Sequence, residues 1–280
     1  MSDTSNPIRL SAQAFIEALQ GKIVQDMLGQ KQIFLTEWNK KKAVVINNVE
    51  IAEKVQIQEN MSFSHIIFLE SPVFQQDFII ENGEFQDLRI QGGEYKYFRI
   101  QKGRFKYFRI QGGKFRGFSV SNGEFKNIFY IQGGVIQHFH IQGGKFQEFI
   151  IFNGKIQDIN IIGNEFQSFD IAGGEFHSLR INGNKVQSFN ITGGEFQEFI
   201  IVNGKFKYFG IQGGKFQEFI IEEGEFQGLS VHKGELQSFN IFGGEIHSLH
   251  FTINITFELI LTGGFIAQLI FENIYSTRWF

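Results

Sequence analysis

The decapeptide IQGGKFQEFI occupies residues 141–150 and returns unchanged at residues 211–220. Related decapeptides fill the chain between these copies and extend beyond them on both sides. Seventeen units follow one another from Gly83 to Phe251 with the pattern Gly-x-h-x-x-h-x-h-x-x, where h is an apolar residue. One extra residue, which we assign to residues 129–131, shifts the frame once. A fixed period of this kind indicates a repeat architecture.

The apolar spacing within each unit predicts two short straight segments joined by corners. Side chains alternate between the two faces of a strand, so Gly83 and Phe85 share a face, as do Leu88 and Ile90. The steps of three residues between these pairs require the chain to bend. One corner holds Gly or Asn, which tolerate the positive φ values of tight turns. A helix is disfavoured because each regularly spaced Gly would cost about 1 kcal/mol.

The residue after each Gly slot indicates how many units make one turn of the solenoid. It is Lys, Arg or Glu in every unit except at Val135. Charged residues two units apart have opposite signs ten times and the same sign three times, whereas one or three units apart show no preference. Neighbouring coils lie about 4.8 Å apart, a distance at which opposite charges attract. The pattern therefore predicts four-sided coils of two units each.

A four-sided coil with five residues per side resembles the pentapeptide-repeat β-helix family. In that family a small residue and a large apolar residue, two positions apart, recur every five residues, and Gly83/Phe85 and Leu88/Ile90 stand in this register. The resemblance covers residues 73–271, and it departs from the family at every second side, where Phe or Leu replaces the small residue. It implies an all-β, four-sided parallel β-solenoid with right-handed coiling, but no functional residue.

The repeat pattern also sets the expected domain organisation. We expect the solenoid to occupy residues 44–275, with its regular part at residues 83–251. A solenoid leaves unpaired strand edges that must be covered. Apolar residues recur with a helical period in residues 12–28, between a capping Ser11 and a terminating Gly29. We therefore expect residues 1–43 to form a short α-helical cap, with a separate docking element as the alternative.

The C-terminal coil, residues 252–280, differs from the repeats in being almost uncharged. Glu258 and Glu272 are the only charged residues between positions 251 and 275. An apolar terminal coil is either tucked into the molecule or used as an interface. We hypothesise homodimerisation or end-to-end stacking at this end. The residues assigned to self-association are Phe257, Ile260, Phe265, Ile270 and Tyr275.

The sequence offers little catalytic chemistry. The 280 residues include no Cys, which excludes disulfides and thiolate sites. GGEF at residues 173–176 and 193–196 matches the signature of diguanylate cyclases, but here it is one variant of the repeated sequence. The pair His138 and His140 has no fixed carboxylate or Cys beside it. We expect a non-enzymatic protein with no catalytic residue, no metal site and no cofactor.

Bulk composition indicates a soluble protein. The net charge is −3, and 42% of the residues are hydrophobic. No segment reaches the roughly 18 apolar residues of a membrane-spanning helix, and the N-terminal residues lack the features of a secretory signal. We expect a cytoplasmic location and no membrane partner.

One region is strongly basic. Ten basic residues and two acidic residues, Glu94 and Glu124, lie between Arg89 and Lys126, a local charge of +8. Tyr97 and Tyr107 lie among them and are suited to stacking on a nucleobase. This basic band is either a solvated surface or a site for nucleic acid or an acidic protein. The candidate contact residues are Arg89, Lys96, Tyr97, Arg99, Lys106, Tyr107, Arg109 and Arg116.

The function that these observations favour is a rigid repeat scaffold for protein–protein interaction or self-assembly. The alternative is a protein that binds an anionic partner through the basic band at residues 89–126.

Overall fold

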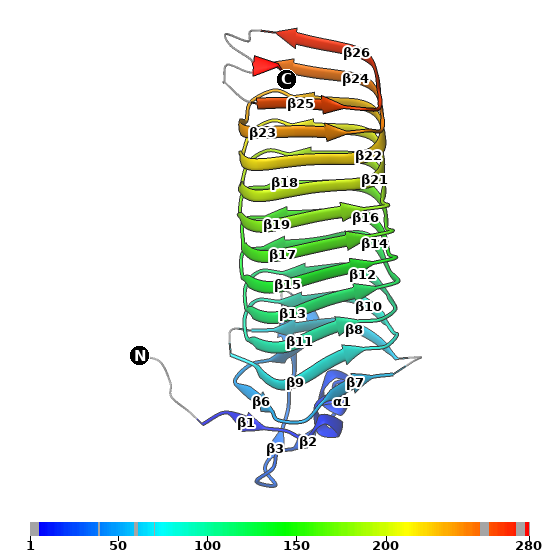
Figure 1. The fold of residues 1–280 in the computed structure, drawn as a ribbon. Helices are drawn as coiled ribbons and strands as arrows, with labels where there is room; N and C mark the ends of the chain where they lie inside the picture. Colours follow the sequence, from blue (N-terminus) through cyan, green and yellow to red (C-terminus); the bar gives the residue numbers. More distant parts are fainter. Residues whose placement is uncertain are drawn as a thin grey trace.

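The computed structural model describes residues 6–38, 40–58, 61–69, 71–252 and 258–272, together with the backbone of residues 278–279. The fold is an all-β parallel β-solenoid of about 20 residues per turn, with one short N-terminal helix. Figure 1 shows the turns stacked into a single rod, with the helix at its N-terminal end. The expected fold class is confirmed.

Strands from successive decapeptides lie on opposite sides of the rod, so they form two ladders. The first ladder contains β8 (Ser62–Phe68), β10 (Glu84–Ile90), β12 (Gly103–Ile110), β14 (Gly123–Gln132), β16 (Lys145–Phe152), β18 (Glu165–Ala172), β20 (Lys185–Ile191), β24 (Glu245–Thr252) and β26 (Phe265–Glu272). The second contains β9 (Val73–Ile80), β11 (Glu94–Ile100), β13 (Lys114–Ser121), β15 (Val135–Gln142), β17 (Lys155–Ile162), β19 (Glu175–Asn182), β23 (Glu235–Phe242), β25 (Glu258–Thr262) and β27 (Arg278–Trp279). Two long strands turn a corner and join both ladders, β21 (Glu195–Ile211) and β22 (Lys215–Val231).

The strand register confirms that two decapeptides make one turn. Phe146 of β16 pairs with Phe166 of β18, and their ring centroids lie 4.8 Å apart. Each strand bends in the middle. In β16 the ladder pairing skips Gln147, and both Phe146 and Phe149 are buried although three positions separate them. The bend is the corner that the apolar spacing predicts.

Glycine forms the other corner because the backbone of adjacent coils approaches closely there. Gly93 has a φ of 99°, and a Cβ atom at this position would lie 2.6 Å from the carbonyl oxygen of Pro72. No other residue type combines this backbone conformation with so little space.

The extra residue of the repeat lies three positions earlier than the sequence indicates. Phe125 pairs with Phe105 and Ile128 with Tyr107, so the insertion is a bulge at Lys126 and Asn127. The assignment to residues 129–131 is wrong. A shift in the apolar pattern locates an insertion only between two aligned apolar slots, and the outward-facing corner accommodates an extra residue without moving a core side chain.

Aromatic rings fill the interior of the rod. Within each ladder they stack on the ring one coil away, as in Phe85 and Phe105 at 4.8 Å and 6° between planes. Across the bend of one strand they meet edge to face, as in Phe105 and Phe108 at 5.6 Å and 89°. Both geometries are favourable for aromatic pairs, so the ring columns are a large part of the core.

Tyr95 is an exception in this interior. Its hydroxyl group is buried and has no hydrogen-bond partner among the described residues. Burial raises the pKa of this hydroxyl well above its ordinary value. A buried, unpaired hydroxyl is destabilising.

Tyr95→Phe is therefore expected to raise the free energy of unfolding by about 1 kcal/mol, because it removes the unpaired hydroxyl and keeps the ring. Phe115 stacks on Tyr95 at 4.6 Å, so the reverse change Phe115→Tyr is a matched control that is expected to destabilise. Chemical denaturation monitored by circular dichroism measures both. Equal or lower stability of Tyr95→Phe would contradict the assignment.

Two asparagines replace the slot glycine and form a buried ladder. The backbone N–H of Gly144 donates to Asn164 Oδ1 at 2.7 Å, and that of Asn164 donates to Asn184 Oδ1 at 2.8 Å. Asn184 Nδ2 donates to the carbonyl oxygens of Ile161 and Asn182. Both asparagine side chains are buried. The ladder satisfies backbone groups at this corner that glycine leaves without a side-chain partner.

The charged slot forms ion pairs between neighbouring coils, as the sign pattern predicts. Lys114 Nζ lies 3.1 Å from Glu94 Oε1, and Lys205 Nζ lies 2.7 Å from Glu225 Oε1. Other pairs at the same spacing are Arg104–Glu84, Lys145–Glu165, Lys155–Glu175, Lys185–Glu165 and Lys215–Glu195. These pairs are exposed, so each stabilises the fold by no more than about 1 kcal/mol.

The N-terminal segment closes one end of the rod with a helix and short strands. Phe15 of the helix packs on the rings of Phe68, Phe74 and Phe78 at the end of the aromatic interior. The elements of this segment are β1 (Ile8–Arg9), α1 (Ala12–Leu19), β2 (Val24–Gln25), β3 (Lys31–Gln32) and β4 (Leu35–Trp38). The strands that follow are β5 (Lys41–Ile46), which pairs in parallel with β8, and β6 (Val49–Ile51) and β7 (Val55–Ile57), which pair in parallel with β9, so they begin the two ladders.

The helix is shorter than the expected 12–28. Ser11 caps it as predicted, because its side chain accepts a hydrogen bond from the N–H of Ala14. Gly21 adopts a φ of 78° immediately after the helix, and the chain continues as the β2–β3 hairpin. The prediction for residues 20–28, including termination at Gly29, is wrong. A glycine in the left-handed backbone conformation ends a helix, even where the apolar residues beyond it keep a helical period.

Across the part of the chain that the structure describes, no helix is long and apolar enough to cross a membrane.

Candidate functional site

The basic band divides into two groups on opposite sides of the rod. Successive strands belong to different ladders, so the structure does not bring the eight candidate residues together. One group lies on β10 and β12 and the other on β11 and β13. The first group is Arg89, Lys106, Tyr107 and Arg109, and the second is Lys96, Tyr97, Arg99 and Arg116.

Acidic residues from outside the band form ion pairs with three of the arginines. Asp87 is buried, and its carboxylate oxygens lie 2.7 Å from Arg89 Nη2 and 2.9 Å from Arg109 Nη1. Arg99 Nη2 lies 3.3 Å from Asp77 Oδ2. Counting charges only between residues 89 and 126 missed these carboxylates. The 20-residue period is the signal that could have found them, because Asp87 lies one coil from Tyr107 and Asp77 one coil from Tyr97.

Two pairs of basic residues keep an unneutralised charge. In the described part of the chain, Lys96 and Arg116 on one side, and Lys106 and Lys126 on the other, have no ion-pair partner. Lys96 and Arg116 occupy equivalent positions in adjacent coils, and Lys126 lies in the bulge opposite Lys106. Such like charges repel one another, so an anion bound between them would relieve the repulsion.

Both tyrosines of the band contact cations of the protein itself. The guanidinium group of Arg99 lies 5.2 Å from the ring centroid of Tyr97, and that of Arg109 lies 4.8 Å from Tyr107. The Tyr107 hydroxyl also accepts a hydrogen bond from Asn127 Nδ2 at 3.0 Å. These contacts hold the rings in place and use part of their surface, which leaves less for stacking on a nucleobase.

The histidines and the GGEF glutamates have simple partners. His138 Nδ1 lies 3.1 Å from Asp158 Oδ2, so the expectation that no carboxylate stands beside the His138 and His140 pair is wrong. Within the described residues, no three His, Cys, Asp or Glu side chains gather as metal ligands would. Glu175 and Glu195 of the two GGEF copies pair with Lys155 and Lys215 at 3.0 and 3.3 Å. Each glutamate therefore has the same environment as its neighbours in the ladder.

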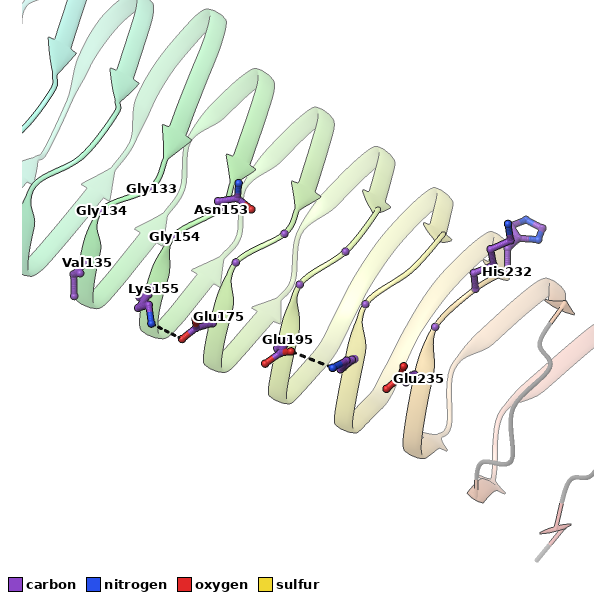
Figure 2. Close-up of a pocket in the computed structure, with 18 of the residues that line it drawn as sticks. Gly133, Gly134, Val135, Asn153, Gly154, Lys155, Glu175, Glu195, His232 and Glu235 are labelled. Carbon is purple, nitrogen blue, oxygen red and sulfur yellow. Dashed lines mark ion pairs between the residues drawn. The ribbon is translucent and has the colours of Figure 1, made fainter.

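A shallow groove that the sequence interpretation missed follows one glycine corner. Its floor is glycine backbone from Gly133 to Gly234, and its volume is about 1360 Å³. Figure 2 shows the charged slot along one wall, with ion pairs joining Lys155 to Glu175 and Glu195 to Lys215. These charges are paired along the wall and do not converge on one point. Paired glycines at residues 133–134, 173–174, 193–194 and 213–214, which recur along one side of the rod, are the signal that could have revealed the groove.

The C-terminal coil exposes apolar side chains. Phe265 of β26 is 64% exposed, and Leu269 on the same strand is also exposed. Ile260 and Ile270 are half-buried. Phe257 and Tyr275, also assigned to self-association, lie outside the described residues. The structure thus adds Leu269 to the candidate surface.

Comparison of the chain with protein-family models, with curated proteins and with solved structures finds no match.

Proposed function

We propose that the protein is a non-enzymatic repeat scaffold that presents a rigid rod and associates with a second copy through its C-terminal coil. The observation that carries the proposal is the edge of β26. This strand pairs with β24 on one side, and no described strand pairs with its other side. An unpaired edge with exposed apolar side chains is a template for association.

The contrast between the two ends of the rod supports this proposal. Helix α1 covers the N-terminal end of the interior with Phe15, whereas no described helix covers Ile266 at the other end. Association of two C-terminal coils would bury Phe265 and Leu269 and pair both strand edges. A twofold arrangement of this kind closes on itself and forms dimers. The proposal includes no cofactor. The expected location of the protein is the cytoplasm.

The double variant Phe265→Glu/Leu269→Glu is expected to convert a dimer to a monomer, because it places four charges in the twofold interface. Sedimentation velocity or light scattering at micromolar concentration measures the change. Phe152→Glu is the matched control, since Phe152 is an exposed aromatic residue in the middle of the rod. A wild-type protein that is monomeric under these conditions would rule out the proposed dimer.

Membership of the pentapeptide-repeat family is part of the proposal. It is supported by the side length of five residues and by the small–large pairs at Gly83/Phe85 and Leu88/Ile90. The Phe or Leu at every second side makes the repeat a ten-residue variant.

Binding of an anionic partner is a second candidate function. The observation that favours it is the unneutralised pair Lys96 and Arg116, which lies beside Tyr97. Single-stranded nucleic acid is the expected ligand, since it combines phosphates with stacking bases. Arg89, Arg99 and Arg109 are less suitable contacts because they already form ion pairs.

Lys96→Glu/Arg116→Glu is expected to abolish binding of a fluorescent single-stranded DNA oligonucleotide, measured by anisotropy. Binding by the wild type should weaken steeply with salt. Lys185→Glu/Lys205→Glu is the matched control, because these residues also stack in adjacent coils and change the net charge equally. An equal loss in both variants would indicate a nonspecific charge effect and refute the site.

A further inference from the structure

The N-terminal hairpin carries an unusual concentration of exposed apolar side chains. Leu28 is 84% exposed and Met27 is 54% exposed. The other large exposed apolar residues of this segment are Ile23, Ile33 and Leu35. Single exposed apolar residues are normal on a protein surface, but a cluster marks an interaction site. The sequence pattern hid this cluster, because a helix over residues 12–28 would have turned Ile23 and Met27 toward the core.

The turn that presents Met27 and Leu28 is held rigidly. Asp26 Oδ1 accepts hydrogen bonds from the N–H groups of Leu28 at 2.9 Å and Gln30 at 2.8 Å, and Asp26 Oδ2 accepts one from Gln32 Nε2 at 2.9 Å. The bond from the Gln30 N–H is the main cause that lowers the pKa of Asp26, so the carboxylate is ionised at neutral pH. A preorganised turn loses little conformational entropy when it binds.

The hairpin is anchored at its base and open at its tip. Val24 is buried in the core, and the N–H of Met27 donates to the carbonyl oxygen of Arg9 at 2.9 Å. A Cβ atom added to Gly29 at the tip would have no heavy atom within 4 Å. Figure 1 shows β2 and β3 beyond α1, at the end of the rod remote from β26. The exposed side chains therefore stand on a convex projection at one end of the molecule.

The charge that the hairpin presents outward is positive. Lys22 and Lys31 are exposed on either side of the turn. Asp26 is the only carboxylate between residues 20 and 33, and its oxygens are directed at the N–H groups of its own turn. An apolar tip between two lysines has the arrangement of a membrane-surface anchor, in which apolar side chains enter the acyl boundary and lysines meet anionic headgroups.

We propose that this hairpin docks the rod end-on to an anionic lipid surface, with Met27 and Leu28 inserted and Lys22 and Lys31 at the headgroups. A bilayer deforms around a convex apolar projection and buries it on all sides, whereas a protein partner would need a matching cavity. The proposal concerns the surface of a membrane, not a membrane-spanning segment, and it replaces the expectation from the sequence that the protein has no membrane partner. It is independent of dimerisation at the opposite end.

Cosedimentation of the full-length protein with vesicles tests the proposal. The wild type should bind vesicles of phosphatidylcholine mixed with phosphatidylserine, bind vesicles of phosphatidylcholine alone weakly, and dissociate as salt is raised. Met27→Ser/Leu28→Ser and Lys22→Ser/Lys31→Ser should each weaken binding to the anionic vesicles roughly tenfold. Leu28→Trp should show a blue shift of its fluorescence on the same vesicles.

Two control variants separate the hairpin from other surfaces. Phe152→Ser/Phe242→Ser removes two exposed apolar residues from the rod, and Lys207→Ser/Lys233→Ser removes two exposed lysines from it. Both should bind as the wild type does. The proposal is overturned if the wild type ignores anionic vesicles, or if the hairpin variants bind them fully. It is also overturned if the hairpin substitutions change the oligomeric state, because a second copy would then be the occupant.

Discussion

Phe129→Ala is expected to lower the free energy of unfolding by about 3–5 kcal/mol, the usual cost of deleting a fully buried Phe. The side chain has no exposed surface. Its ring centroid lies 4.8 Å from those of Phe108 and Phe125 and 5.0 Å from that of Phe149. These neighbours belong to three successive coils, and stacked backbones that are held by ladder hydrogen bonds have little freedom to close the resulting cavity.

Chemical denaturation measures this loss, with a local readout such as hydrogen exchange in β12, β14 and β16. Neighbouring coils carry the stability of a solenoid, so the loss should be concentrated in those strands. Phe152→Ala is the control, because Phe152 lies at an exposed corner and surface changes cost about 0.5 kcal/mol or less. A loss of about 1 kcal/mol or less for Phe129→Ala would contradict the close-packed aromatic interior.

Asn184→Asp is expected to destabilise the protein by about 4 kcal/mol at neutral pH. The new carboxylate would be fully buried, and one of its oxygens would face the carbonyl oxygens that Asn184 Nδ2 now contacts. Burial of this kind raises the pKa of a carboxyl group by about 3 units, and each unit corresponds to about 1.4 kcal/mol.

The sign of the pH dependence follows from this raised pKa. Below about pH 4 the new carboxyl group is protonated in both the folded and the unfolded state, so the penalty is absent. The penalty grows as the pH rises toward the folded pKa. Thermal unfolding of the variant across this range measures the effect. Asn184→Gly is the control, because it restores the usual residue of the slot and should show no such pH dependence. A pH-independent stability of Asn184→Asp would contradict a buried ladder.

The architecture could be predicted because every unit repeats the same spacing of glycine and apolar residues. The spacing of Gly83, Phe85, Leu88 and Ile90 specifies both the faces and the corners of the chain. The alternation of Lys and Glu two units apart specifies the turn length, since it reports on contacts between coils. Ion pairs such as Lys114–Glu94 and Lys205–Glu225 have the spacing that this alternation predicts.

The N-terminal segment and the bulge could not be predicted in the same way because neither one repeats. A single apolar period over residues 12–28 is compatible with a helix, yet Gly21 takes a left-handed conformation and the remaining residues form a hairpin. The bulge at Lys126 and Asn127 lies where outward-facing residues carry no apolar signal. In both cases the pattern occurs only once, and a single occurrence is compatible with more than one backbone conformation.

Of the candidate surfaces, the sequence reveals the one at the C-terminal coil but misplaces the residues of the basic band. Phe265 is exposed because it occupies the slot that holds Glu245 one coil earlier, and this replacement of a charged residue is visible in the sequence. The basic band looked like a single surface because its residues are close along the chain. Strands of successive decapeptides lie on opposite sides of the interior, so neighbours in sequence become remote in space, and residues 20 positions apart become neighbours.

By itself the sequence determined the solenoid, its two-unit turn and the identity of its core, because these depend on periodic burial of apolar side chains. Only the tertiary structure decided which charges neutralise one another and which apolar residues remain exposed. Asp87 forms ion pairs with both Arg89 and Arg109, and Leu28 projects from a hairpin turn rather than from a helix. The physical reason is that burial follows a local period along the chain, whereas ion pairing and exposure depend on contacts between segments that the period alone does not place.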